Sequence, residues 1–220
     1  YLRRYRQYEA RLAAQLRRIA ARSLAATGID AVAPLFTILF PQAQQDQQAR
    51  AAALALRRAL LLVTGGPGTG KTTTIARLLL LRIAQARATG VDAPRIALAA
   101  PTGRAADRMA ESLGRARALL AEAGAVDTDL LAAMPDRAQT LHRLLGPVRH
   151  SRHFRHHRDH PLTHDIEVVD EASMVDLPMM CKLVEAIADG SQLALLADPD
   201  QLPSVEAGDV LAALLAAAAP

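Results

Sequence analysis

The chain has 220 residues, contains no tryptophan, and has a single cysteine, Cys181. One cysteine cannot form an intramolecular disulfide, so we expect a reducing compartment and a cytoplasmic location. No apolar run reaches the ~18 residues that a membrane-spanning helix needs. The Arg-rich N-terminus also lacks the apolar segment of a signal peptide. These absences exclude a disulfide scaffold and predict no membrane association.

Lysine is also scarce, because only Lys71 and Lys182 are lysines among 26 basic residues. Positions that need only positive charge are nearly all arginine, so a lysine indicates a more specific requirement. Lys71 lies in GGPGTGKT, residues 65–72, which fits the P-loop pattern G-x-x-x-x-G-K-[ST]. The net charge of +4 only weakly suggests a nucleic-acid partner.

The P-loop pattern has the sequence context that it needs. An aliphatic run at 59–63 reads as a buried strand, and a helix-compatible run at 72–85 follows. Glycines let backbone N–H groups turn toward an anion, and the helix N-terminus adds partial positive charge. Lys71 would reach the β- and γ-phosphates, and the Thr72 hydroxyl would ligate Mg²⁺. The predicted nucleotide-binding residues are Gly65, Gly66, Pro67, Gly68, Thr69, Gly70, Lys71, Thr72 and Thr73.

From residue 48 onward, helix and strand patterns alternate. We predict helices over 48–58, 72–87, 104–122, 138–145, 177–188 and 207–218, and strands over 59–64, 96–100, 166–170 and 192–197. This alternation predicts an α/β fold with a parallel sheet and helices on both faces. Functional loops should then meet at the carboxyl ends of the strands.

The first 45 residues have a different pattern. Residues 1–26 predict a basic amphipathic helix, residues 29–40 a short apolar segment, and residues 42–48 a Gln-rich link. We therefore expect a small N-terminal helical unit over 1–45 and an ATPase domain over 46–220. The basic face of the first helix could be simply solvated or could face a partner.

Carboxylates follow the third predicted strand, about 100 residues after the P-loop. Asp170 would hold Mg²⁺ with Thr72, and Glu171 would orient or deprotonate the attacking water. After the fourth strand, Gln201 would touch the γ-phosphate through its amide. A surface acidic pair or a turn at Asp200 would leave the same pattern, and the P-loop favours the catalytic interpretation.

Two further groups follow predicted strands. Thr102 and Arg104 open the helix after the second strand, where a hydroxyl and an arginine suit a phosphodiester or a nucleotide phosphate. Capping of the helix by Thr102 would explain the same residues. Thr140 and His142 form a similar but weaker group.

Six of the seven histidines lie between His150 and His164. Their spacing does not match a structural zinc site, and the neighbouring arginines would repel a metal cation. We therefore predict a solvated and mobile loop over this segment.

Taken in order, these segments resemble the first motor domain of superfamily-one DNA helicases, most closely the RecD family, the alpha subunits of exodeoxyribonuclease V. The matching segments are GGPGTGKTTT at 65–74, APTGRAADRM at 100–109, QTLHRLLG at 139–146, VVDEASMVDLPMM at 168–180 and LLADPDQLPSVEAG at 195–208. The resemblance extends to the first residues of the chain. Ala197 departs from the glycine that the family more often has. Gln47 lies where the family's adenine-reading glutamine is expected.

The resemblance implies an ATP-dependent 5′ to 3′ helicase subunit that works beside RecB and RecC in double-strand break repair and recombination. It implies catalytic roles for Lys71, Glu171 and Gln201, and a RecA-like ATPase domain. Thr102, Arg104, Thr140 and His142 would face single-stranded DNA, and the unit over 1–45 would dock against RecC.

The chain begins at Tyr1 rather than Met and stops in an alanine run, so we expect it to be part of a longer protein. Helicases of this type hydrolyse ATP between two RecA-like domains, and the second supplies an arginine finger. We therefore predict that this segment alone binds Mg·ATP weakly and neither unwinds DNA nor shows DNA-stimulated hydrolysis.

Two other functions are compatible with a P-loop. A GTPase would need an Asn/Thr-Lys-x-Asp element to select guanine. The only lysine outside the P-loop, Lys182, lies in CKLV, so this element is absent. A small-molecule kinase would need a substrate lid, and no candidate for one stands out. A non-translocating ATP-binding scaffold or clamp subunit remains open. Glu171 and Gln201 favour an active ATPase over it.

Overall fold

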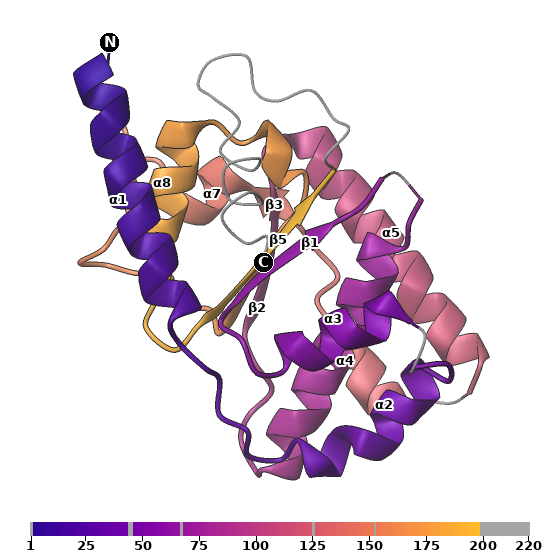
Figure 1. Ribbon diagram of the computed structural model, residues 1–220. Helices are drawn as coiled ribbons and strands as arrows, with labels where there is room; N and C mark the ends of the chain where they lie inside the picture. Colours follow the sequence, from indigo (N-terminus) through magenta and orange to yellow (C-terminus); the bar gives the residue numbers. More distant parts are fainter. Residues whose placement is uncertain (1, 44–45, 67, 125, 152, 199–220) are drawn as a thin grey trace.

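A parallel sheet forms the centre of the fold in the computed structural model, which describes residues 2–43, 46–66, 68–124, 126–151 and 153–198 (Figure 1). Within these residues, the strands are β1 (Leu60–Thr64), β2 (Ile96–Ala100), β3 (Gln139–Thr140), β4 (Ile166–Val169) and β5 (Gln192–Ala197). Their order is β1-β5-β4-β2-β3, and all neighbours are parallel. The predicted α/β fold with a parallel sheet is confirmed.

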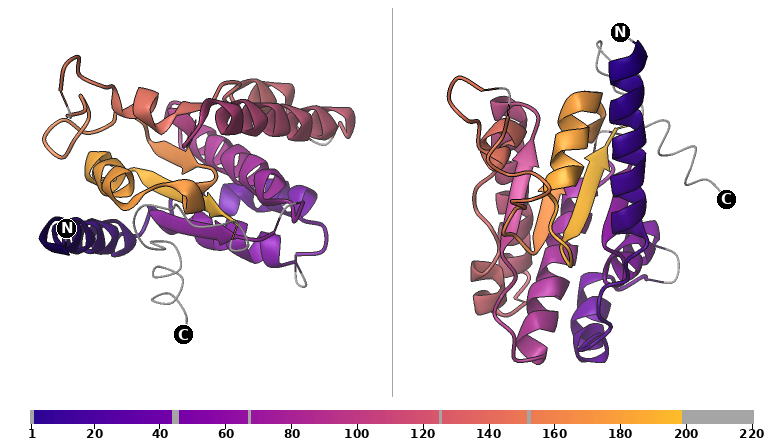
Figure 2. Two further views of the ribbon diagram at one scale, coloured as in Figure 1. Left: turned by 90° about the horizontal axis from the view of Figure 1, so that it is seen from above. Right: turned by 90° about the vertical axis from the view of Figure 1, so that its left-hand side faces the viewer.

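Helices cover both faces of this sheet, as the view from above shows (Figure 2). The helices are α1 (Leu2–Ala20), η1 (Asp30–Val32), α2 (Ala33–Leu39), α3 (Gln47–Ala55), α4 (Lys71–Ala88), α5 (Gly103–Glu122), α6 (Thr128–Ala132), α7 (Leu141–Leu145), η2 (Ala172–Met174) and α8 (Leu177–Ala186). Side chains of α1, α7 and α8 pack on one face, and those of α2 to α6 pack on the other. Successive apolar residues along β1 and β5 therefore contribute alternately to the two hydrophobic clusters.

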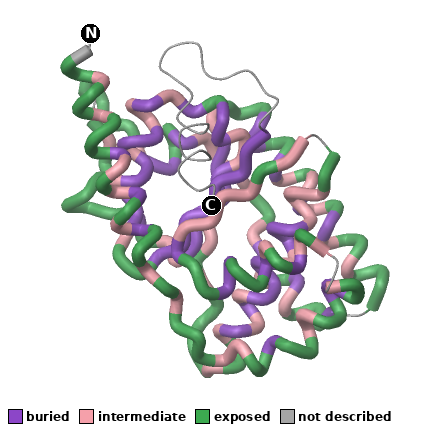
Figure 3. Tube along the Cα trace, in the orientation of Figure 1, coloured by how far each residue is buried: buried purple, intermediate pink, exposed green. Residues whose placement is uncertain are grey.

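The central strands are buried on both faces, as expected for a parallel sheet between helices (Figure 3). Val168 joins the cluster under α4 and α5, while its neighbour Val169 joins the cluster under α8. Both residues are fully buried. The aliphatic composition of these strands thus follows from their position.

The N-terminal helix shares its core with the rest of the chain. Leu12, Leu16 and Ile19 of α1 are buried in the cluster that includes α8 and the sheet. Arg11 adds an ion pair to Glu185 of α8 at 2.7 Å. In the same way, Phe40, after α2, is buried in the cluster on the other face. The division at residue 45 stays a prediction, and the structure places hydrophobic contacts across it.

Some element boundaries differ from the sequence prediction. The predicted helix over 138–145 begins only at Leu141, because Gln139 and Thr140 pair with β2 as an edge strand. The Thr140 hydroxyl caps the helix by accepting the N–H of Arg143 at 3.2 Å. Helix α6 was not predicted, and the predicted helix over 207–218 lies outside the described residues. Within the described residues, every helix is too short or too polar to cross a membrane.

Candidate active site at the carboxyl edge of the sheet

The P-loop joins β1 to α4 and depends on glycine at two described positions. Gly68 and Gly70 have φ angles of 76° and 83°, in the left-handed region that side chains disfavour. Gly70 is also the N-cap of α4, and a Cβ there would lie 2.7 Å from the Gln48 amide nitrogen. The loop conformation therefore requires glycine at position 70 for its backbone, while a Cβ would also displace the end of the Gln48 side chain.

Side chains of the loop fold back onto its own carbonyl groups. The Lys71 ammonium donates hydrogen bonds to the carbonyl oxygens of Gly65 and Gly66, the latter at 3.0 Å. The Thr69 hydroxyl donates to the same Gly66 oxygen at 2.9 Å. Lys71 is thus held at the mouth of the loop, beside the amides of the α4 N-terminus.

A cavity of about 350 Å³ brings the loop together with the predicted carboxylates. Its lining comprises Gly66, Gly68, Thr69, Gly70, Lys71, Thr72, Thr73, Ser112, Asp170, Glu171, Ala197 and Asp198. These residues come from the loop after β1, the start of α4, the residues that follow β4, the end of β5 and the middle of α5. The strand ends meet here because parallel strands end at one edge of the sheet. The structure therefore places Thr72 and Asp170 at one cavity rather than on opposite faces.

Thr72 and Asp170 offer the hydroxyl and carboxylate oxygens that Mg²⁺ prefers. Asp170 follows β4, and its N–H donates to the Ala99 carbonyl of β2 at 2.9 Å, which continues the sheet by one bond. One carboxylate oxygen of Asp170 accepts the N–H of Glu171 at 2.8 Å. This bond orients the carboxyl group, so the donor set fits a divalent cation.

Glu171 adopts an unusual backbone conformation, with φ 51° and ψ 40° in the left-handed region. Its carboxylate pairs with the Arg108 guanidinium of α5 at 2.6 Å. The Glu171 side chain is 15% exposed and the Arg108 side chain is 64% exposed. The proposed catalytic carboxylate therefore points toward α5.

The role expected of Gln47 in adenine recognition stays a prediction. Gln47 is the exposed first residue of α3, whereas the Gln48 amide donates to the Thr69 carbonyl at 3.1 Å. Gln48 is thus the glutamine of this helix that contacts the P-loop. Asp46 fixes the start of the helix by accepting the Gln48 N–H at 2.8 Å. Gln201 and Pro67 lie outside the described residues.

The predicted DNA-side residues lie at the ends of neighbouring strands. β2 and β3 pair so that Ala100 is opposite Thr140, which brings Thr102 and Thr140 to the same edge. Thr102 accepts the N–H of Ala105 at 3.2 Å, so both threonines cap helices. Each hydroxyl still has a proton to donate. Arg104 is exposed beside them.

The exposed His142 ring lies edge-on to Phe154, with ring centroids 5.7 Å apart. Phe154 belongs to the His-rich segment. The Lys182 ammonium lies over its ring, 4.9 Å from the ring centroid. Leu162 further anchors this segment, since it is 2% exposed and its N–H donates to the Ala186 carbonyl at 2.8 Å. Phe154 and Leu162 thus anchor the segment to α7 and α8, while most of its described residues are exposed, as predicted for a solvated loop.

Sequence reasoning missed Gln48, Arg108 and Ser112. Ser112 lines the nucleotide cavity from α5, and Arg108 contacts Glu171 one turn earlier. The four-residue spacing of Arg104, Arg108 and Ser112 on a predicted helix was an available signal, because such residues share a face. The contact with Glu171 itself depends on tertiary packing.

The fold and the site together define a P-loop domain that binds nucleotide. The AAA domain family matches residues 48–207, and the chain belongs to this family. Among its relatives is "RecBCD enzyme subunit RecD" of Mycolicibacterium smegmatis, 51% identical over 171 residues, which cover 77% of this chain and 30% of that protein. The sequence resemblance to the RecD family is thus confirmed.

Two further relatives extend the comparison. "RecBCD enzyme subunit RecD" of Haemophilus influenzae is 44% identical over 179 residues, covering 80% of this chain and 27% of that protein. The "ATP-dependent RecD2 DNA helicase" of Deinococcus radiodurans is 38% identical over 159 residues, covering 72% of this chain and 18% of that protein. The chain thus spans less than a third of the length of these relatives.

Two solved structures of Pif1 helicases are more distant. One describes DNA unwinding at forked double-stranded DNA by two coordinating Pif1 helicases, with a TM-score of 0.39 and 20% identity over 82% of this chain and 37% of that chain. The other is a Bacteroides Pif1 helicase with ADP-AlF3 and single-stranded DNA, with a TM-score of 0.36 and 21% identity over 71% of this chain and 32% of that chain.

Proposed function

We propose that this chain forms the ATP-hydrolysing motor domain of a DNA helicase subunit in a RecBCD-type helicase/nuclease. The observation that carries the proposal is the shared cavity of Lys71, Thr72, Asp170 and Glu171. The relatives named RecD and RecD2 support the assignment to DNA processing. The full helicase would act in double-strand break repair and recombination.

In the proposed reaction, the P-loop amides and Lys71 hold the β- and γ-phosphates of ATP. Mg²⁺ held by Thr72 and Asp170 would offset negative charge on these phosphates. Glu171 accepts a proton from water while the water oxygen bonds to the γ-phosphorus. The bond from that phosphorus to the β,γ-bridging oxygen breaks, which yields ADP and inorganic phosphate. Gln201 would contact the γ-phosphate.

Adenine recognition also belongs to this site. The resemblance assigns it to Gln47, and the contact of the neighbouring Gln48 with Thr69 supports a position for this helix start beside the P-loop. Both glutamines are therefore candidates for the base contact. Separate Gln47→Ala and Gln48→Ala variants distinguish them, since loss of discrimination between ATP and GTP should follow only one of the substitutions.

Single-stranded DNA is the proposed polymer substrate. Thr102, Arg104, Thr140 and His142 would contact its backbone, because they lie at the same sheet edge as the nucleotide cavity. Hydroxyl and guanidinium groups at helix starts suit phosphate oxygens. We propose movement in the 5′ to 3′ direction, by resemblance to the RecD family.

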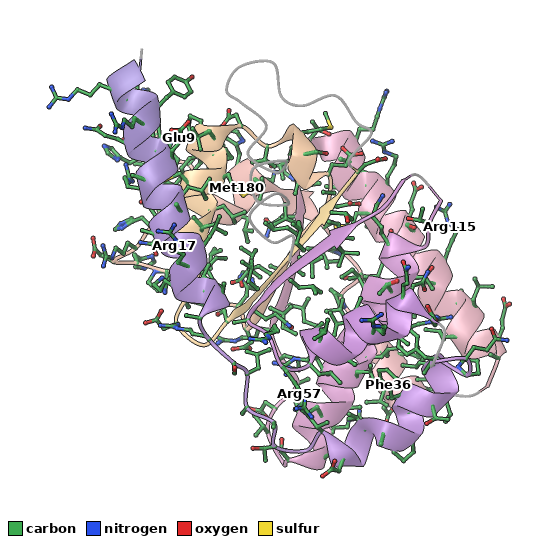
Figure 4. The ribbon with its side chains drawn as sticks, viewed as in Figure 1. Glu9, Arg17, Phe36, Arg57, Arg115 and Met180 are labelled. Atoms are coloured by element: carbon green, nitrogen blue, oxygen red, sulfur yellow. The ribbon has the colours of Figure 1, made fainter. Side chains whose placement is uncertain are left out.

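The proposed protein partners are RecB- and RecC-type subunits. Helix α1 packs on α8 through its apolar stripe, so its exposed arginines, among them Arg3, Arg6 and Arg17, face outward. Arg17 projects away from the sheet (Figure 4). We propose that residues 1–45 offer this basic face to the RecC-type subunit.

Steady-state ATP hydrolysis by the full-length parent in its complex tests the proposal against a non-translocating scaffold. We expect hydrolysis that rises on addition of an oligothymidylate strand and that falls by roughly 10³-fold in Lys71→Ala. An Arg115→Ala variant, at an exposed position of α5, is the control and should behave as the parent. Hydrolysis without any response to DNA would instead favour the scaffold.

A further inference from the structure

Helix α5 connects the proposed DNA-side residues with the nucleotide cavity. Arg104, Arg108 and Ser112 are spaced by four residues, so they form one stripe along the helix. Arg104 lies in the first turn, next to Thr102, and Ser112 lines the nucleotide cavity. Arg108 stands between them, one turn from each. The residue in the middle of this stripe is therefore placed to respond to both sites.

Arg108 holds the carboxylate that would accept the proton from water. Its Nη2 donates to the Oε1 of Glu171 at 2.6 Å. A charge-assisted hydrogen bond of this length fixes the direction of the Glu171 side chain toward α5. A general base must instead lie within hydrogen-bond reach of the water that it deprotonates. While the Arg108–Glu171 ion pair is made, the orientation of Glu171 is set by α5.

The two partners differ in exposure, and this difference indicates which of them a second ligand can reach. The Glu171 side chain is largely enclosed at 15% exposure, whereas the Arg108 side chain is 64% exposed. Because the Arg108 end of the ion pair is exposed, solvent screens the interaction and a competing anion can reach the guanidinium and replace Glu171. A phosphodiester is such an anion, because guanidinium binds phosphate through paired hydrogen bonds.

The backbone of Glu171 is held separately from its carboxylate. Its φ of 51° is in the left-handed region, which non-glycine residues rarely adopt. Asp170 accepts the Glu171 N–H at 2.8 Å and so holds this conformation at the base of the side chain. The carboxylate can therefore turn about the side-chain torsions while the backbone stays in place.

We propose that Arg108 is a positioning residue that couples DNA binding to ATP hydrolysis. In the paired state, Arg108 directs Glu171 toward α5. When a DNA phosphate next to Arg104 engages the Arg108 guanidinium, Glu171 is released to face the attacking water. This inference rests on the proposed function and names how its DNA site controls its nucleotide site.

The test is steady-state ATP hydrolysis by the full-length parent in its complex, with and without an oligothymidylate strand. We expect Arg108→Ala to raise kcat without DNA roughly tenfold or more, a part of the 10²–10⁴ that a positioned base contributes. The KM for ATP should change little, since Arg108 is outside the cavity lining. The ratio of rates with and without DNA should fall toward one, and Arg108→Gln should behave likewise.

Three further variants separate this role from a structural one. Arg108→Lys keeps a cation opposite Glu171 and should retain most of the DNA dependence. Arg115→Ala removes an exposed arginine farther along α5 (Figure 4) and should match the parent. The double variant Arg108→Ala/Glu171→Gln should lose the raised rate, because that rate depends on the freed carboxylate.

The outcomes distinguish this inference from the proposed function. A parent complex whose hydrolysis ignores DNA contradicts both. A parent that DNA stimulates, together with an Arg108→Ala variant whose DNA-free rate is unchanged or lowered, overturns the role of Arg108 alone. A thermal unfolding midpoint for each variant confirms that the rates belong to folded protein.

Discussion

Glu167 places a carboxyl group inside the fold, where its side chain is fully buried in strand β4. Neither carboxyl oxygen has a hydrogen-bond partner. Burial, with a smaller contribution from the charge of Asp165, raises the pKa of Glu167 to about 8. The group is therefore neutral in the folded protein at neutral pH, whereas in the unfolded chain it ionises near its ordinary pKa.

This raised pKa predicts a pH-dependent stability. Between about pH 4.5 and pH 8, the folded state keeps a proton on Glu167 that the unfolded state has released. The contribution of Glu167 to the free energy of unfolding is therefore most favourable below about pH 4.5 and falls as the pH rises to about 8. Glu167→Met removes the titrating group and should increase the free energy of unfolding at pH 8 by a few kcal/mol, on the order of 1.4 kcal/mol per pH unit of the shift.

Urea unfolding at pH 5 and pH 8.5 measures this effect. Glu167→Gln is the matched control, because it also removes the charge but keeps an unpartnered polar group, and it should be less stable than Glu167→Met. The free energy of unfolding should fall from pH 5 to pH 8.5 by more in the parent than in either variant. An equal fall in the parent, Glu167→Met and Glu167→Gln would contradict the assignment to Glu167.

At the P-loop, Gly70→Ala should abolish nucleotide binding. The substitution strains the backbone, because φ at position 70 is 83°, and it also displaces the Gln48 amide that contacts the loop. Gly114→Ala is the matched control, since a Cβ there meets no atom within 4 Å in the interior of α5 and should add about 0.5–1 kcal/mol of stability. Titration with a fluorescent ATP analogue measures both, and unchanged affinity in Gly70→Ala would argue against a role for the loop.

Among the elements, the long aliphatic strands could be predicted from sequence because buried parallel strands read as continuous apolar runs. The predicted limits of 96–100 and 192–197 agree with β2 and β5. β3 could not be found in this way, because it is two residues long and is defined by its pairing with β2. Such an element is specified by its neighbour in space rather than by its own pattern.

The candidate site was predictable to a similar degree. Motif spacing placed Lys71, Thr72 and Asp170 correctly at one edge, since the topology of a parallel sheet fixes which loops meet. Spacing could not give the direction of the Glu171 side chain, which depends on a left-handed backbone and on Arg108 from another element. Contacts of this kind follow from packing and stay beyond a pattern argument.

The contact between α1 and α8 can be tested with the chain's own thiol. Cys181 is fully buried in α8, and burial, followed by the charge of Glu185, raises its pKa to about 11. A buried thiol with so little thiolate at pH 8 should react slowly with an aromatic disulfide reagent. We expect full reaction only in urea.

A substitution in α1 should accelerate this reaction. Leu16 is 5% exposed in the same cluster as Cys181, so Leu16→Ala should cost about 2–5 kcal/mol and loosen the helix. The exposed neighbour Arg17→Ala is the control and should leave the rate unchanged. Equal labelling rates in both variants would indicate that α1 does not cover Cys181 in solution.

For the whole molecule, the proposed function sets the expectation. The chain covers 30% of the RecD relative from Mycolicibacterium smegmatis. The resemblance to the RecD family implies hydrolysis that uses an arginine finger from a second domain. We predict that the 220-residue chain alone binds Mg·ATP weakly and shows no DNA-stimulated hydrolysis. A phosphate-release assay with and without oligothymidylate checks this, and stimulated turnover by the isolated chain would contradict it.

The hydrogen bonds of Lys71 to two loop carbonyls have a consequence for selectivity among phosphates. When a phosphate ligand binds, Lys71 must give up these neutral carbonyl acceptors for phosphate oxygens. Each exchange replaces one hydrogen bond of Lys71 with another. The net gain then comes mostly from the difference in charge between a carbonyl and a phosphate oxygen. Ligands should consequently rank by the number of negative charges that they bring to the lysine, with triphosphate ahead of diphosphate and monophosphate last.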